Sequence, residues 1–205
     1  MNTIIYQNQL LAPSKVVCIG RNYVEHIEEL GNEIPENMVL FNKPNSAITN
    51  RLYYFSEHCR FEGEICFLIE QGKIAGVGFG LDLTHADVQK QMKEKGLPWE
   101  RAKAFDDSAV LSAFVPLEEA VESLAMELTI NGERVQFANY GLMMYKPEAM
   151  LEEIQTFMTL GDGDVIMSGT PKGVNSYRVG DIFVGRVYAR EKLLVEQSWR
   201  VESRG

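Results

Sequence analysis

Two glutamates, Glu62 and Glu64, stand directly before a strongly apolar run in the segment from Arg60 to Ile69. Successive side chains of a β-strand point to opposite faces, so these two carboxylates share one face. Like charges beside a buried run are costly unless a cation or a shared proton neutralises them. The pattern therefore indicates a hard divalent metal, although Glu-x-Glu alone more often marks an edge strand whose polar face lies in water.

A third carboxylate follows on the next predicted strand. Gln71-Gly72-Lys73 predicts a tight turn, and the strand after it covers Ile74 to Gly80. Pairing of the two strands would return Asp82 toward Glu62 and Glu64. The interpretation as a metal site gains support from this third acidic residue.

A histidine and a glutamate lie three positions apart on a predicted helix from Val24 to Leu30. His26 and Glu29 can hydrogen-bond at this spacing, and the carboxylate would fix the imidazole tautomer and raise its basicity. Such a pair can take a proton from water as a general base. Alone, the pair is more often an ordinary exposed contact.

Two loops each have two interpretations. The polar loop after Gly31, through Glu36 and Asn37, would close over a substrate as a lid, or would simply connect two elements. The turn from Ser168 to Val174 is rich in backbone donors, so it can hold a carboxylate or merely reverse the chain.

A helix is predicted to start at Thr84, with Asp87 completing a capping-box-like pattern, and to run to about Lys95. Its N-terminus would lie beside the predicted metal, where free backbone N–H groups favour an anionic substrate.

Composition limits the class of protein. With 205 residues, 45% hydrophobic and 24% charged, the chain suits one globular domain over residues 1–205, with residues 1–14 as a short lead-in. A net charge of −9 argues against nucleic acid and anionic membranes as partners. Three cysteines without metal-site spacing predict reduced thiols in a cytoplasmic protein. We also expect no signal peptide and no membrane span.

Five short motifs in order resemble the catalytic domain of the fumarylacetoacetate hydrolase family, from about residue 14 to about residue 200. They are Gly20-Arg21-Asn22-Tyr23-x-x-His26-x-x-Glu29, Glu62-x-Glu64, Leu81-Asp82-x-Thr84-x-x-Asp87-x-Gln89, Lys103, and Gly169-Thr170-Pro171-x-Gly173-Val174. Each motif alone is weak, and their order makes the resemblance specific.

The resemblance implies a role for the acidic residues and the histidine. Glu62, Glu64 and Asp82 match carboxylates that hold Mg²⁺, Mn²⁺ or Ca²⁺ in the family. His26 and Glu29 match a pair that activates water on a mobile lid. The resemblance also implies an α+β fold, in which a mixed β-sheet is rolled into an irregular barrel with a few flanking helices, and a homodimer.

The remaining matched residues would contact the substrate. Lys103 matches a lysine that stabilises a developing enolate or oxyanion, whereas residue type alone would place a lysine on the surface. Arg21, Gln89 and Thr170 match positions that bind the substrate, with Arg21 the weakest match.

Three departures from the family pattern bear on the pocket. Ala86 stands where the family commonly has an arginine, which affects substrate recognition more than metal binding. The segment between Glu64 and Asp82 is short and lacks a helix. Asn175 stands where many relatives have a glycine.

These roles predict a hydrolase that cleaves the C–C bond of 2,4-dioxo acids (acylpyruvates) through an enolate stabilised by the metal. We prefer hydrolysis because the His26–Glu29 pair is intact. Oxaloacetate decarboxylation or tautomerisation, and isomerisation of 2-hydroxyhepta-2,4-diene-1,7-dioate, use similar chemistry and are alternatives. A non-catalytic binding protein is disfavoured because the metal, water-activating and lysine residues are all present.

Overall fold

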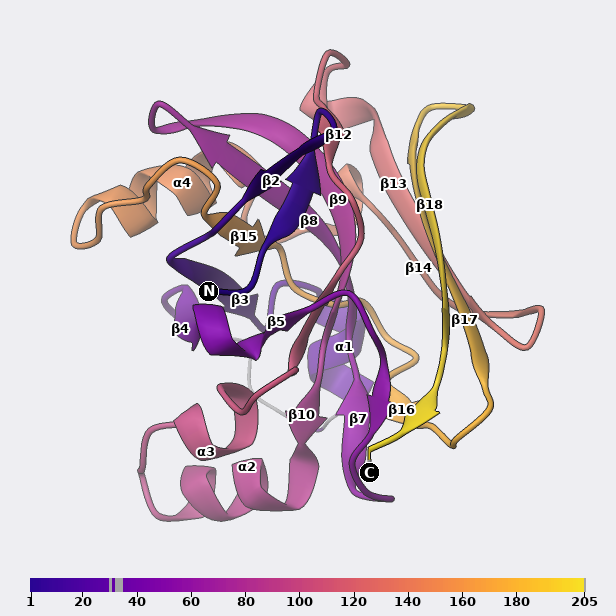
Figure 1. The fold of residues 1–205 in the computed structure, drawn as a ribbon. Helices are drawn as coiled ribbons and strands as arrows, with labels where there is room; N and C mark the ends of the chain where they lie inside the picture. Colours follow the sequence, from indigo (N-terminus) through magenta and orange to yellow (C-terminus); the bar gives the residue numbers. More distant parts are fainter. Residues whose placement is uncertain (30, 32–34, 205) are drawn as a thin grey trace.

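The structure of the protein is a computed structural model that describes residues 1–29, 31 and 35–204. Two β-sheets pack face to face, and short helices lie around their margins (Figure 1). Helices α2 and α3 lie together at one end of the molecule, while α4 lies on the opposite side from the second sheet (Figure 1).

The principal sheet has eight strands and mixed direction. Strand β15 runs parallel to β3 and antiparallel to β8, and β11 runs parallel to β5 and antiparallel to β9. In spatial order the strands are β4 (Val39–Pro44), β3 (Lys15–Gly20), β15 (Val165–Met167), β8 (Gly63–Glu70), β9 (Lys73–Asp82), β11 (Ala109–Leu111) and β5 (Ile48–Thr49), with β12 (Val115–Pro116) paired to β9.

The second sheet is antiparallel, in the order β14 (Glu133–Asn139), β13 (Leu124–Ile130), β17 (Ile182–Ala189) and β18 (Lys192–Arg200). There are three smaller sheets among the described residues. One has three strands in the order β10 (Thr84–His85), β7 (Cys59–Phe61) and β16 (Asn175–Ser176). The other two are the pairs β1 (Ile4–Tyr6) with β2 (Gln9–Leu11), and β6 (Tyr53–Tyr54) with β19 (Glu202–Ser203). The α-helices are α1 (Val24–Glu29), α2 (Ala86–Glu94), α3 (Glu100–Lys103) and α4 (Pro147–Gln155), and the 3₁₀ turns are Asn45–Ala47, Val121–Ser123 and Tyr140–Leu142.

Aromatic side chains fill the space between the two large sheets. The rings of Phe79 on β9 and Trp199 on β18 lie with their centroids 6.1 Å apart. Phe79 of β9 lies directly over Gly185 of β17, where a Cβ atom would collide with the ring. Glycine at position 185 thus lets the second sheet approach the strand that ends at Asp82, and this packing fixes the position of that carboxylate.

The α+β prediction, a curled mixed sheet with few helices, is confirmed. The tight turn at Gln71 and Gly72 is also confirmed, because both residues have positive φ and connect β8 directly to β9 without a helix. Residues 1–14 differ from a plain lead-in, since they contain the hairpin β1–β2, whose Ile4 side chain is buried.

Two other expectations are modified. The predicted strand from Arg60 to Ile69 is interrupted at Glu62, which lies between β7 and β8. The helix predicted from Val24 to Leu30 corresponds to α1, which covers Val24–Glu29 within the described residues. Leu30 and residues 32–34 of the predicted lid lie outside the described residues.

Three free cysteines, Cys18, Cys59 and Cys66, are buried, as expected for reduced thiols. Among the described residues, no helix has the length and apolar character needed to cross a membrane.

Candidate metal and active site

The three acidic residues predicted from the sequence meet in one cluster. Glu62, Glu64 and Asp82 each offer a carboxylate oxygen, and these oxygens all lie within 4.8 Å of one another. The β8–β9 hairpin brings them together, because the amide of Asp82 donates to the carbonyl of Glu62 at 2.8 Å. Glu64 is 2% exposed and Asp82 is fully buried. The alternative of an edge strand with its polar face in water is therefore wrong.

Lys103, at the end of α3, points into this cluster. Its Nζ lies 2.6 Å from Asp82 Oδ2 and 2.9 Å from Glu62 Oε2, and it also donates to the Thr84 hydroxyl. The residue is only 2% exposed, so the default of a surface lysine is wrong. Its positive charge is held where negative charge would develop on a bound substrate.

A second buried lysine, Lys43 of β4, was not identified from the sequence. Its Nζ lies 2.8 Å from Asp82 Oδ1 and donates to Ser108 Oγ at 3.0 Å, to the carbonyl of Leu83 and to the carbonyl of Lys103. Asp82 thus lies between two ammonium groups. The sequence carries no signal for this role, because only the tertiary approach of β4 to β9 brings Lys43 to the cluster.

Burial and mutual repulsion shift the pKa values of the cluster. Burial raises the pKa of Glu64 well above its ordinary value, and the charges of Asp82 and Glu62 raise it further. Burial also raises the pKa of Asp82, although Lys103 and Lys43 oppose it. For Glu62 the charge and hydrogen bond of Lys103 are the main causes that outweigh burial, so its pKa is lowered.

The donor set fits a hard divalent cation. Three carboxylates supply the oxygen ligands that Mg²⁺, Mn²⁺ and Ca²⁺ prefer, and their close approach is unfavourable without positive charge between them. Repulsion from Asp82 and Glu62 adds to burial, the largest cause, in raising the pKa of Glu64.

The His26–Glu29 pair is formed on α1. His26 Nδ1 lies 3.2 Å from Glu29 Oε2, and Glu29 also accepts a hydrogen bond from the amide of Gly173 at 3.0 Å. His26 is largely buried and lines a small cavity together with Glu62 and Lys103. The pair is therefore not an ordinary exposed contact, and it faces the acidic cluster.

The turn from Ser168 to Val174 does hold carboxylates, and they belong to the protein itself. The amide of Gly169 donates to Glu64 Oε2 at 2.6 Å, and that of Gly173 donates to Glu29. Gly169 and Gly173 have φ of +94° and +101°, a conformation that glycine adopts without strain. One turn therefore positions both an acidic-cluster residue and the histidine's partner.

Thr170 has a scaffolding contact. Its hydroxyl donates to the carbonyl of Gly63 at 3.0 Å and accepts from Gln136 Nε2 at 2.9 Å, while Gln136 Oε1 accepts from the amide of Gly63. Thr170 does not belong to the residues that line either cavity beside the cluster. Gln136, from the second sheet, was not identified because nothing in a hairpin strand marks this long-range contact.

Two adjoining cavities border the cluster, and both are lined by Glu62, Gln89 and Lys93. The inner one, of about 40 Å³, also contains Arg21, His26 and Lys103, so it collects most of the predicted site residues. The outer one, of about 560 Å³, also contains Glu29 and Ala86. Arg21 thus lines the inner cavity, and Gln89 lines both.

The predicted cap at Thr84 is wrong. Helix α2 begins at Ala86 with His85 as its N-cap and without a side-chain capping bond. Thr84 instead donates to Glu62 Oε1 at 2.8 Å and accepts from Lys103. Hydrogen bonds to charged groups are stronger than those to a backbone amide, so the acidic cluster uses this hydroxyl.

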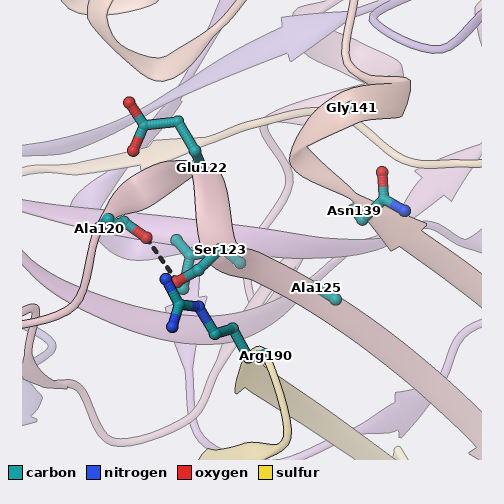
Figure 2. Close-up of a pocket in the computed structure, with 8 residues that line it drawn as sticks. Ala120, Glu122, Ser123, Ala125, Asn139, Gly141 and Arg190 are labelled. Carbon is teal, nitrogen blue, oxygen red and sulfur yellow. Dashed lines mark hydrogen bonds between the residues drawn. The ribbon is translucent and has the colours of Figure 1, made fainter.

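A separate hollow of about 580 Å³ lies on the second sheet, lined by Ala120, Glu122, Ser123, Leu124, Ala125, Asn139, Gly141 and Arg190 (Figure 2). The Ser123 hydroxyl donates to the carbonyl of Ala120 at 2.6 Å. None of the residues that line this hollow belongs to the acidic cluster.

Comparison with known proteins agrees with this site. The family described as fumarylacetoacetate (FAA) hydrolase C-terminal matches residues 15–198. Oxaloacetate tautomerase YcgM of Escherichia coli strain K12 is 39% identical over 187 residues, covering 82% of this chain and 85% of the relative. The mitochondrial oxaloacetate tautomerase FAHD1 of Homo sapiens is 32% identical over 205 residues, covering 91% of each.

Among solved structures, fumarylpyruvate hydrolase from Pseudomonas aeruginosa, in complex with Mn²⁺ and pyruvate, superposes with a TM-score of 0.88. It is 28% identical, and the match covers 99% of this chain and 96% of that one. The chain belongs to the fumarylacetoacetate hydrolase family, as its five motifs indicated, and it is an enzyme of that family.

Proposed function

We propose that this protein is a divalent-metal-dependent oxaloacetate tautomerase, which interconverts the enol and keto forms of a 2-oxo acid. The observation that carries the proposal is the position of Lys103, whose ammonium contacts Glu62 and Asp82 at the wall of the inner cavity. The identity with the E. coli tautomerase supports oxaloacetate as the substrate.

The acidic cluster would hold the metal. A cation bound by Glu62, Glu64 and Asp82 would supply a Lewis acid for the oxygens of the 2-oxo acid. Mg²⁺ or Mn²⁺ is the proposed ion, with Ca²⁺ as a third hard cation, and Mn²⁺ in the Pseudomonas relative supports this choice.

The protein's own residues account for the proton movements. Nδ1 of His26 faces Glu29, which leaves Nε2 as the nitrogen that exchanges a proton with C3 of oxaloacetate. Enolisation would move one proton from C3 to His26, and a proton from solvent would then add to the C2 oxygen; ketonisation would reverse both transfers. Lys103 stabilises the negative charge on the C2 oxygen between these steps.

A second candidate is hydrolysis of an acylpyruvate, the function preferred from the sequence. It is favoured by the intact His26–Glu29 pair, which could activate water, and by the likeness to fumarylpyruvate hydrolase. Oxaloacetate decarboxylation and isomerisation of 2-hydroxyhepta-2,4-diene-1,7-dioate share the enolate chemistry. They rank below the tautomerase because a relative that is 39% identical to this chain is an oxaloacetate tautomerase.

A paired assay tests the proposal. The purified protein is stripped of metal, supplied with Mg²⁺ or Mn²⁺, and given oxaloacetate and acetylpyruvate in parallel. Rapid enol–keto conversion of oxaloacetate with little cleavage of acetylpyruvate supports the tautomerase. The reverse result supports the hydrolase, and release of CO₂ from oxaloacetate supports a decarboxylase.

Three further expectations from the sequence belong to this proposal. They are a single catalytic domain over residues 1–205, a homodimer and a cytoplasmic location. Light scattering of the purified protein tests the homodimer, and cell fractionation tests the location.

A further inference from the structure

Lys93 of α2 lines both cavities beside the acidic cluster. Gln89 lies one helical turn before it, so both side chains leave the same face of α2. Lys93 is half-buried, and its Nζ lies 5.1 Å from the centroid of the Trp99 ring. Trp99 lines the inner cavity too, so this cation–π contact holds the ammonium at the junction of the two spaces.

No carboxylate or hydrogen-bond acceptor bonds directly to this ammonium in the part of the chain that the structure describes. Burial lowers the pKa of Lys93 and the positive charge of Arg21 lowers it further, while the carboxylate of Glu62 opposes them without forming an ion pair. A half-buried cation without a directly bonded counter-ion is unfavourable, and an anionic ligand would relieve this cost.

Lys93 differs in this respect from Lys103. Lys103 forms ion pairs with Asp82 and Glu62, whereas Lys93 forms none among the described residues. The inner cavity is therefore lined by Glu62 of the acidic cluster and by two further cations, Lys93 and Arg21. A ligand with one anionic group toward a metal held by the acidic cluster and a second one toward Lys93 would match both.

We propose that Lys93 binds the second carboxylate of a dicarboxylate 2-oxo acid and sets the preference for such acids over monocarboxylates. This inference rests on the proposed function, and it adds the residue that distinguishes the substrate class. The 2-oxo acid end lies toward Glu62 and Lys103, and the distal carboxylate accepts hydrogen bonds from Lys93 Nζ.

The test compares two ligands that differ only at the distal group. 2-Oxobutanoate carries a methyl group where oxaloacetate carries its second carboxylate. The KM for oxaloacetate and the inhibition constant of 2-oxobutanoate are measured for the Mg²⁺-loaded protein and for Lys93→Met, which keeps an apolar stem over Trp99. Loss of a hydrogen bond to a charged group corresponds to a rise of about ten- to a hundredfold in the KM for oxaloacetate.

Three outcomes follow. The inference is supported if the constant for 2-oxobutanoate changes less than about threefold while the KM for oxaloacetate rises as stated, with Lys93→Arg restoring most of the affinity. Parallel loss for both ligands would assign Lys93 a general structural or electrostatic role and overturn the inference. An unchanged KM would overturn it as well.

Lys95→Met is the matched control, because Lys95 is exposed at the C-terminal end of the same helix and lines neither cavity. It should leave both constants unchanged. If the wild-type protein does not turn over oxaloacetate, the proposed function fails. The inference about Lys93 is then tested by calorimetric binding of oxaloacetate and 2-oxobutanoate, which needs no turnover, and equal affinities would overturn it.

Discussion

The Nζ atom of Lys103 lies 2.6 Å from Oδ2 of Asp82, and both side chains are buried. The carboxylates of Asp82 and Glu62 outweigh burial and raise the pKa of Lys103, so the ammonium stays charged through the whole working pH range. This lysine therefore serves the acidic cluster in two ways. It neutralises part of the negative charge in the metal-free protein, and under the proposed function it would also provide positive charge for a substrate anion.

Lys103→Met should abolish turnover and destabilise the metal-free protein by about 3–5 kcal/mol, because it leaves buried carboxylates without their cation. Saturating Mg²⁺ should recover much of this loss, since the metal binds only the folded protein. Urea denaturation with and without Mg²⁺ measures both effects. A variant with full activity would contradict the role of Lys103, and Lys95→Met, at an exposed lysine that lines neither cavity, is the control.

Glu64→Gln should weaken divalent-metal binding by roughly a hundredfold or more, because it removes a carboxylate that Gly169 already orients. Calorimetric titration measures the affinity. Glu70→Gln, at the far end of the same strand, should leave it unchanged. Equal affinities for wild-type protein and Glu64→Gln would show that the cluster is not the metal site.

Metal affinity should also depend on pH. The pKa of Glu64 is raised well above its ordinary value, so the metal must displace a proton at pH values below that raised pKa. Affinity should therefore increase as pH rises above the ordinary glutamate range and level off once Glu64 is ionised. Titration in two buffers of different ionisation enthalpy should reveal proton release, and Glu64→Gln should reduce it.

His26→Ala should slow oxaloacetate tautomerisation by about 10²- to 10⁴-fold, because the proposal makes its imidazole the group that exchanges a proton with C3. A loss confined to acylpyruvate cleavage would instead assign His26 to water activation. Glu25→Gln, on the exposed side of the same helix, is the control and should leave both rates unchanged. Full tautomerase activity in His26→Ala would contradict the proton-transfer role.

Asp164 should make the fold sensitive to acid. Burial would raise its pKa, but hydrogen bonds from Lys15, Gly161 and Ser14 outweigh burial and lower it. Its ionised form therefore adds stability that is present above the ordinary aspartate pKa and is lost as pH falls through the lowered value. Asp164→Asn should cost about 2 kcal/mol at pH 7 and progressively less below about pH 4.

Urea denaturation of Asp164→Asn across this pH range measures the difference in unfolding free energy. The exposed Asp106 provides a matched control, since Asp106→Asn should give little difference at any pH. A cost for Asp164→Asn that stays constant down to pH 2 would show that ionisation of Asp164 does not stabilise the fold.

Local pattern was sufficient to predict the acidic cluster. Strand alternation predicted Glu62 and Glu64 on one face, with a tight turn that returns Asp82 to them, and the three carboxylates do meet even though the strand is interrupted at Glu62. Lys43 and Gln136 could not be predicted in the same way. They reach the site from β4 and from the second sheet, and the approach of such distant strands leaves no mark in the sequence around either residue.

Thr84 shows how tertiary contacts can override a local motif. Its sequence context predicts a helix cap, yet its hydroxyl bonds to Glu62 and Lys103 because these charged partners compete successfully with the backbone amide of the helix. The same hydroxyl therefore links α3 to the acidic cluster.

The central claim is that the cluster of Glu62, Glu64 and Asp82 binds a divalent cation and uses it to enolise a 2-oxo acid. The most direct measurement is the rate of oxaloacetate enol–keto conversion by the metal-stripped protein, before and after addition of Mg²⁺ or Mn²⁺, beside Glu64→Gln. The account predicts that metal restores activity to the wild-type protein and fails to restore it to the variant at the same concentration. Full activity without metal, or equal activity in the variant, would contradict it.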